Sequence, residues 1–191
     1  GRMAEKLKRP LLLVGCGKMG GAMLEGWLAS GIAAAGAYVV EPFGADAFAN
    51  RRDVTVVSSA DELPADLSPQ VIIFAVKPQA MSAVVGAYTK FVTPDCLFVS
   101  VAAGTTISFF EMELGAEAAI VRAMPNTPAA VGQGITVICP NAKATAQQVA
   151  DADALLQAVG ETARIEDEAL MDAVTGVSGS GPAYVFLMIE C

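Results

Sequence analysis

The chain has 191 residues, of which 54% are hydrophobic and 17% are charged, a composition too apolar and too weakly charged for a disordered protein. Its length predicts one domain of ordinary size with a short remainder. The formal net charge of −8 argues against nucleic acid or an anionic membrane surface as a partner, because the overall field would repel both. We therefore expect a small molecule as the ligand, and an anionic one would have to be held locally by helix N-termini and single cations.

The histidine and cysteine content argues against the usual metal sites. The sequence contains no histidine, and its four cysteines, Cys16, Cys96, Cys139 and Cys191, are widely spaced. Neither a Cys-x-x-Cys pair nor a Cys/His cluster is therefore available to bind a metal. Scattered thiols fit a reducing, cytoplasmic location. No apolar run approaches the roughly 20 residues that a membrane-spanning helix needs.

Short apolar runs alternate with segments of helical pattern, which predicts an α/β fold of the Rossmann type, with a doubly wound, mostly parallel sheet. Met19, Met23 and Trp27 recur at helical spacing in the first helical segment, and we interpret them as core packing. The expected strands lie at residues 11–14, 37–40, 54–57, 71–76, 97–101, 119–122, 135–139 and 162–165. The expected helices lie at residues 19–29, 79–91, 107–114 and 145–159.

The same patterns predict three regions. Residues 1–10 are expected to form an N-terminal tail, in which Gly1 and Arg2 precede Met3 as a cloning remnant. Residues 11–165 form the α/β domain. From residue 166 the pattern becomes wholly helical, and the chain stops at Cys191 shortly after an apolar run that is typical of a helix interior. We therefore expect residues 166–191 to be the truncated beginning of a second, helical domain.

Gly15, Gly17 and Gly20 form a G-x-G-x-x-G series directly after the first apolar run and at the start of the first helical segment. Glycines at these positions permit a tight turn and let backbone amides approach a pyrophosphate. Alone, such a series also occurs in turns that bind nothing, but the strand and helix around it favour a dinucleotide. The predicted phosphate-binding loop consists of Gly15, Cys16, Gly17, Lys18, Met19 and Gly20.

Glu41 ends the second expected strand, about 20 residues after the glycine series, where an acidic residue accepts hydrogen bonds from the adenosine ribose hydroxyls. A carboxylate there would repel the 2′-phosphate of NADP, so Glu41 favours NAD. Two alternatives stay open. Arg51 or Arg52 could reach back to such a phosphate, and Glu41, which precedes Pro42, could be a solvated loop residue.

Three further strands are expected to end at the same edge of the sheet, where open parallel sheets bind ligands. Ala75-Val76-Lys77-Pro78 follows the fourth strand, and Lys77 could hold a cofactor phosphate or an acidic substrate. Ala102-Ala103-Gly104 follows the fifth, with small residues that would admit a flat nicotinamide ring. Met124-Pro125-Asn126-Thr127-Pro128 is expected to form a stiff loop after the sixth, in which Asn126 could bind a carboxamide. A surface lysine and rigid turns without a ligand remain as alternatives.

Ser178-Gly179-Ser180-Gly181-Pro182 precedes the last helical run. Glycines expose backbone amides, and proline suits the first turn of a helix, so these residues predict an anion site that a substrate carboxylate would fit. An ordinary Ser/Gly helix cap explains the same residues equally well.

Taken together, these strings resemble the pyrroline-5-carboxylate reductase family. The matching strings are GCGKMGGAM from Gly15, FAVKPQ from Phe74, SVAAGTTI from Ser100, RAMPNTPAAVGQG from Arg122 and MDAVTGVSGSGPAYVF from Met171. The chain departs from the family in two respects. It reads Ser58-Ser59-Ala60 where the family often has an asparagine, and it lacks the further helices with a Ser-Pro-Gly-Gly-Thr-like segment.

The resemblance implies a dinucleotide-binding Rossmann domain followed by a helical domain that forms a homodimer or a larger homo-oligomer and binds substrate. It also implies hydride transfer from NADH or NADPH to the cyclic imine pyrroline-5-carboxylate, giving L-proline. The implied catalytic residues are Lys77, Ser178 and Ser180, and the implied substrate-binding residues are Ser178, Gly179, Ser180 and Gly181. The implied cofactor site adds Glu41, Ala75, Val76, Lys77, Pro78, Ala102, Ala103, Gly104 and Asn126 to the glycine loop.

The absence of histidine suits this chemistry, because a protonated imine is already an electrophile and needs no histidine acid. Two alternatives stay open. A β-hydroxyacid dehydrogenase shares the glycine series but would be expected to carry a lysine on a later helix, and residues 145–191 contain none. A dinucleotide-binding or sensing module would bind without turnover. Since the helical domain is expected to be incomplete, we also expect the chain by itself to be poorly active.

Overall fold

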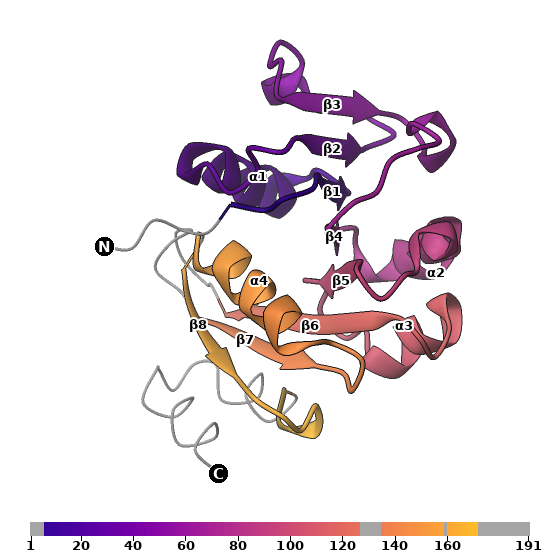
Figure 1. Ribbon diagram of the computed structural model, residues 1–191, viewed down its shortest axis with the longest axis vertical. Coiled ribbons are helices and arrows are strands. Elements are labelled where there is room, and N and C mark those ends of the chain that lie inside the picture. The colour runs from indigo at the N-terminus through magenta and orange to yellow at the C-terminus, as the bar shows by residue number, and fades with distance from the viewer. Residues whose placement is uncertain (1–5, 127–134, 159, 172–191) are drawn as a thin grey trace.

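The computed structural model describes residues 6–126, 135–158 and 160–171, and it confirms the doubly wound α/β fold (Figure 1). Within the described residues, one sheet contains eight strands in the order β3-β2-β1-β4-β5-β6-β7-β8. Neighbouring strands are parallel except for the antiparallel pair β6 and β7. The strands are β1 (Leu11–Val14), β2 (Ala37–Val40), β3 (Val54–Val57), β4 (Val71–Phe74), β5 (Leu97–Ser100), β6 (Ala119–Asn126), β7 (Ile135–Pro140) and β8 (Glu161–Arg164).

Helices cover both faces of the sheet, and the alternation of side chains along each strand decides which face a residue serves. In β1, Leu11 and Leu13 pack with α1 (Lys18–Ser30) and α4 (Ala146–Gln157). Leu12 and Val14 pack on the opposite face, with α2 (Met81–Val84) and α3 (Ile107–Leu114). Because both faces are covered, the central strands are apolar at successive positions.

One face of α1 is buried, as its sequence pattern predicts, except at its first turn. Met23 and Trp27 are buried, and the indole Nε1 of Trp27 donates a hydrogen bond to the carbonyl of Leu155 in α4 at 2.8 Å. Met19, expected in the core, is instead 44% exposed. It lies in the first turn of α1, where its side chain is open to solvent among the described residues.

The ends of α3 and α4 follow local capping signals. The hydroxyl of Thr106 accepts a hydrogen bond from the N–H of Phe109 and so caps α3, whose bounds are those predicted. Thr145 and Gln148 form a reciprocal capping box at the start of α4. The capping box starts α4 one residue later than the expected helix at residues 145–159, and α4 ends two residues earlier, at Gln157.

The single helix expected at residues 79–91 is wrong. The structure divides this stretch into a 3-10 turn η3 (Pro78–Ala80), the short α2, and a 3-10 segment η4 (Val85–Phe91). Gly86 and the β-branched Val84, Val85 and Thr89 are weak helix formers. The buried residues Met81, Val85, Tyr88 and Phe91 are still three or four positions apart, so the 3-10 geometry keeps one face of this stretch in the core. Two further 3-10 turns, η1 (Asp46–Phe48) and η2 (Ala60–Glu62), lie in the connections that follow β2 and β3.

The loop expected after residue 122 is also wrong, because β6 continues to Asn126. Met124 and Pro125 lie opposite Val137 and Thr136 in the antiparallel ladder with β7. Long-range pairing with β7 therefore extends residues that their prolines suggest as a turn. In contrast, β4 and β5 are shorter than expected, so residues 75, 76 and 101 belong to the loops that follow them.

Residues 7–9, assigned to a tail from the sequence, contact the sheet domain. Leu7 is buried, and its N–H donates to the carbonyl of Ile32 at 3.0 Å. The backbone N–H groups of Lys8 and Arg9 both donate to Oε1 of Gln70, at 2.8 and 3.0 Å. No helix within the described residues is long and apolar enough to cross a bilayer.

Candidate functional site

The candidate site lies where β1 is flanked by β2 and β4. From β1 the chain crosses to α1 on one face of the sheet, and from β4 it crosses to α2 on the other. Such a reversal opens a crevice at the carboxyl ends of the strands. The glycine turn after β1 is tied to both neighbours, because Gly15 N–H donates to the Val40 carbonyl at 2.9 Å and Ala75 N–H donates to the Val14 carbonyl at 2.8 Å.

The three glycines of the turn are required for different reasons. Gly15 has a φ of +90°, and a Cβ there would lie 2.8 Å from Cγ1 of Val76. A Cβ on Gly20 would lie 2.6 Å from the carbonyl oxygen of Gly15, so this glycine lets α1 pack closely on the turn. A Cβ on Gly17 would meet nothing within 4 Å. Gly17 is the N-cap of α1, so the open space beside it lies at a helix N-terminus, where a pyrophosphate fits.

A first groove, which we call the adenosine-side groove, opens between the glycine turn and the ends of β2 and β3. Glu41 and Phe43 come from the loop after β2, and Ser58 and Ser59 come from the loop after β3. Residues of α2 and η4 line the opposite wall, including Tyr88. Sequence reasoning did not identify Phe43 or Tyr88 as site residues, since neither belongs to a motif.

A second groove, the nicotinamide-side groove, opens on the other side of the turn. It is lined by residues 17–20, residues 75–78, residues 101–103, Met124 and Pro125. Gly17, Ala75, Val76 and Lys77 line both grooves. The two grooves are therefore adjacent and form one trough that passes the N-terminus of α1, the arrangement that an extended dinucleotide needs.

Glu41 is held against the glycine turn by backbone amides. Its Oε1 accepts a hydrogen bond from Cys16 N–H at 2.9 Å, and its Oε2 accepts one from Phe43 N–H at 3.3 Å. Both carboxylate oxygens are thus engaged, and the charge stays at the rim of the adenosine-side groove. Burial raises the pKa of the half-buried Cys16 thiol, and the negative charge of Glu41 raises it further.

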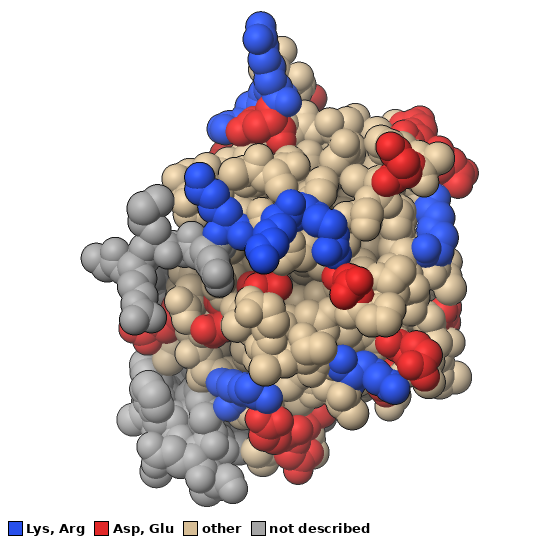
Figure 2. All heavy atoms as spheres, viewed as in Figure 1, with Lys and Arg blue, Asp and Glu red and all other residues tan. Residues whose placement is uncertain are grey.

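Of the basic residues near the trough, Lys77 and Lys18 line the grooves, whereas Arg51 is paired with an acidic side chain. Lys77 is exposed, directly precedes η3 and lines both grooves. Lys18 lines the nicotinamide-side groove at the start of α1. Arg51 instead forms two hydrogen bonds with Asp53, at 2.9 and 2.8 Å, so in this structure it does not reach back to the ribose position. Figure 2 shows acidic and basic side chains interspersed over one face of the molecule, with broad uncharged areas between them.

The structure brings most of the sequence-predicted cofactor residues together. Residues 15–20, 75–78, 102 and 103 and Glu41 line the trough or make its turn. Gly104 has a φ of +74° and shapes the loop before α3, but it lines neither groove. Asn126 is the last residue of β6. Ser178, Gly179, Ser180 and Gly181 lie outside the described residues, as do Thr127 and Pro128.

Among the described residues, no group of three or more His, Cys, Asp or Glu side chains could hold a metal ion.

Two family models match the chain. Residues 11–104 match the model described as NADP oxidoreductase coenzyme F420-dependent, and residues 168–191 match the pyrroline-5-carboxylate reductase dimerisation model. The chain is 41% identical over 183 residues to a pyrroline-5-carboxylate reductase of Pseudomonas aeruginosa, covering 94% of this chain and 66% of the relative. It is 38% identical over 187 residues to that of Escherichia coli, covering 96% and 68%. The chain thus spans about two thirds of the length of these relatives.

Solved structures agree with these matches. A pyrroline-5-carboxylate reductase from Coxiella burnetii superposes with a TM-score of 0.80 at 29% identity, over 96% of this chain and 68% of that one. The pyrroline carboxylate reductase of Plasmodium falciparum, solved with NADP bound, superposes with a TM-score of 0.74 at 28% identity. The match covers 97% of this chain and 68% of that one. A prephenate dehydrogenase from Aquifex aeolicus superposes with a TM-score of 0.74 at 16% identity, over 89% of this chain and 64% of that one. At this identity the similarity is one of fold alone.

Proposed function

Because the chain belongs to the pyrroline-5-carboxylate reductase family, we propose that it binds NADH or NADPH along the trough and that the protein reduces pyrroline-5-carboxylate to L-proline. The observation that carries the proposal is the open space at Gly17, between two grooves that share residues on either side of the α1 N-terminus. Gly15 and Gly20 are explained by packing. Packing gives no reason for a glycine at position 17, whereas a pyrophosphate bound against the backbone there requires the absence of a side chain.

The chain's residues then have distinct tasks. The N-terminus of α1 holds the pyrophosphate through its free N–H groups. Lys77, exposed where the two grooves join, supplies a positive charge to a phosphate or to the substrate carboxylate. The small side chains of Ala102 and Ala103 leave room for the nicotinamide ring in the second groove. Ser178, Ser180 and the glycines beside them are proposed to bind the substrate carboxylate.

When bound, the reduced nicotinamide supplies the hydride. The substrate imine nitrogen carries a proton before reduction, so the carbon that receives the hydride is already electron-poor and the product is a neutral secondary amine. No side chain has to donate a proton in that step. The chain has no histidine, and its task is to hold the two reactants in contact and to exclude water.

Glu41 favours NADH over NADPH. Its carboxylate is held by the backbone N–H groups of Cys16 and Phe43 at the rim of the adenosine-side groove. A 2′-phosphate would have to displace it or approach its charge, whereas ribose hydroxyls could donate to it. Arg51 is paired with Asp53, so less positive charge is available to balance the charge of a 2′-phosphate.

The match to a dimerisation model at residues 168–191 supports assembly into a homodimer or a larger homo-oligomer. We place the boundary between the nucleotide-binding and helical domains at residue 166, close to the start of that match. The cytoplasmic location that the scattered thiols indicate stays a prediction. The named relatives favour this activity over a β-hydroxyacid dehydrogenase or a sensing module.

The test is to incubate the purified protein with pyrroline-5-carboxylate and either reduced cofactor, and to follow both loss of reduced nicotinamide and formation of proline. We expect one proline for each cofactor oxidised, and no oxidation without the imine. Gly17→Val, which should fold but not admit the pyrophosphate, is the matched negative control. Because this chain covers about two thirds of its relatives and is expected to be poorly active alone, the sensing module would be supported only if a protein with the complete helical domain also bound cofactor without forming proline.

A further inference from the structure

A buried ion pair joins the sheet to the segment that follows β8. Arg122, in the centre of β6, has a side chain that is 3% exposed, and its Nη1 lies 2.9 Å from Oε2 of Glu168. The Nε atom of Arg122 is buried and has no hydrogen-bond partner within the described part of the chain. The guanidinium therefore depends on Glu168 for its charge balance, since a buried cation without a counter-charge is costly.

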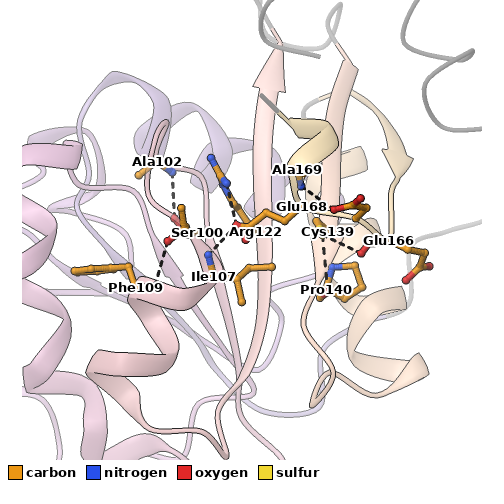
Figure 3. A network of polar contacts seen from close by, with 12 residues as sticks. Ser100, Ala102, Ile107, Phe109, Arg122, Cys139, Pro140, Glu166, Glu168 and Ala169 are labelled. Atoms are coloured by element: carbon orange, nitrogen blue, oxygen red, sulfur yellow. Dashed lines mark hydrogen bonds and ion pairs between the residues drawn. The ribbon is translucent and has the colours of Figure 1, made fainter. Parts of the chain in front are cut away.

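The same carboxylate oxygen makes a second contact, with the start of α3. Oε2 of Glu168 accepts a hydrogen bond from Ile107 N–H at 2.8 Å, and Ile107 is the first residue of α3. Figure 3 shows Glu168 reaching from its own segment to both Arg122 and Ile107. The helix N-terminus and the guanidinium thus share one negative charge.

These contacts hold both ends of the loop between β5 and α3. At one end, Ser100 lies opposite Arg122 in the parallel ladder, and its hydroxyl accepts a hydrogen bond from Ala102 N–H at 3.3 Å. At the other end, Ile107 is bound by Glu168. The residues between include Val101, Ala102 and Ala103, which line the nicotinamide-side groove. The Glu168 carboxylate therefore links the end of this loop, at Ile107, to β6, the strand that pairs with the start of the loop at Ser100.

Glu168 is also the first residue matched by the dimerisation model. Its segment is anchored to the sheet, because Ile165 and Met171 are buried and Ile165 N–H donates to the Ile138 carbonyl at 2.9 Å. We infer that Glu168 is a positioning residue, which fixes the loop of residues 101–106 through Arg122 and Ile107 and thereby couples the dimerisation segment to the nicotinamide half of the cofactor site. The inference rests on the proposed function, since it assigns the second groove to the nicotinamide.

The test compares two ligands that differ in the nicotinamide half. NADH would occupy both grooves, whereas ADP-ribose, which lacks the nicotinamide, would occupy only the adenosine-side groove and the helix N-terminus. We expect Glu168→Gln to weaken NADH binding on the order of tenfold and to leave the affinity for ADP-ribose unchanged. Calorimetric titration of both ligands into wild type and variant measures this difference.

A matched control lies two residues away. Glu166 forms an ion pair of 2.8 Å with Arg164, but the two side chains are 74% and 49% exposed. Glu166→Gln removes the same charge from the same segment and should change neither affinity. If Glu168→Gln folds poorly, the double variant Arg122→Met with Glu168→Gln removes the buried cation together with its partner and should show the same selective loss of NADH.

Each outcome separates the inference from the proposed function. If wild type binds neither NADH nor ADP-ribose, the proposed function fails. If wild type binds both and Glu168→Gln weakens both equally, or neither, then Glu168 has a purely structural role and the inference is overturned. Hydrogen exchange gives an independent readout, because exchange in residues 101–110 should rise in Glu168→Gln and not in Glu166→Gln.

Discussion

The carboxylate of Glu41 accepts a hydrogen bond from the backbone N–H of Cys16 at 2.9 Å, which joins the end of β2 to the glycine turn after β1. The contact spans 25 positions of sequence, and it places a fixed negative charge between the expected adenosine ribose and the expected pyrophosphate. Both the cofactor preference and the reactivity of the neighbouring thiol should depend on this charge.

Replacing Glu41 by Ser should relax the preference for NADH by about 1 to 2 kcal/mol, the scale of a lost charge-assisted hydrogen bond or a removed repulsion. The ratio of the NADPH and NADH dissociation constants, from fluorescence titration, measures the change. Glu113→Gln, an exposed position on α3, controls for net charge. A wild-type protein that already prefers NADPH several-fold would contradict the ribose assignment.

Gly17→Val and Gly20→Ala should separate binding from folding. The space beside Gly17 is open, so Val should change the free energy of unfolding by less than about 1 kcal/mol while most cofactor affinity is lost. Ala at position 20 would place its Cβ 2.6 Å from the Gly15 carbonyl oxygen and should cost about 1 to 3 kcal/mol of stability. Urea unfolding and cofactor titration of both variants check this, and equal cofactor affinity in Gly17→Val and wild type would refute the pyrophosphate assignment.

The Cys16 thiol should react slowly near neutral pH and faster as the pH rises, because burial and Glu41 raise its pKa and so lower its thiolate fraction. Glu41→Gln removes one of these causes, so the pKa should fall and alkylation at a given pH should accelerate. Rates are best measured by mass spectrometry in a Cys191→Ser background. An unchanged rate in Glu41→Gln would show that the charge does not act on the thiol.

Two buried thiols provide the internal reference for that experiment. Burial raises the pKa of Cys96 to about 12 and, together with nearby Glu168 and Glu166, raises the pKa of Cys139 to about 11. Both should remain unlabelled in the folded protein at pH values where Cys16 reacts.

Trp27→Phe should lower the free energy of unfolding by about 1 to 3 kcal/mol, because it removes the hydrogen bond from Nε1 to the Leu155 carbonyl and leaves a small void between α1 and α4. Chemical denaturation followed by circular dichroism measures the loss. Phe43→Ala, at a side chain that is 96% exposed, is the control and should leave stability unchanged. A loss of similar size in both variants would argue against a specific role for the indole.

The sequence by itself determined the features that depend on residues close together in the chain. Strands buried on both faces must be apolar at successive positions, so β1 was recognisable as a strand. The glycine series occupies a single turn between β1 and α1. These local signals predicted the α/β fold, most element positions and the nucleotide-binding edge of the sheet.

Only the tertiary structure decided features that depend on distant partners. Pairing with β7 extended β6 through Pro125, and among the described residues Met19 is exposed although it shares the helical spacing of the buried Met23 and Trp27. Arg122 and Glu168 are 46 positions apart, and nothing in either local sequence indicates that one carboxylate serves both the buried guanidinium and the start of α3. The physical reason is that burial and charge pairing arise when the sheet brings these residues together, whereas periodicity and capping are already present in each short stretch of chain.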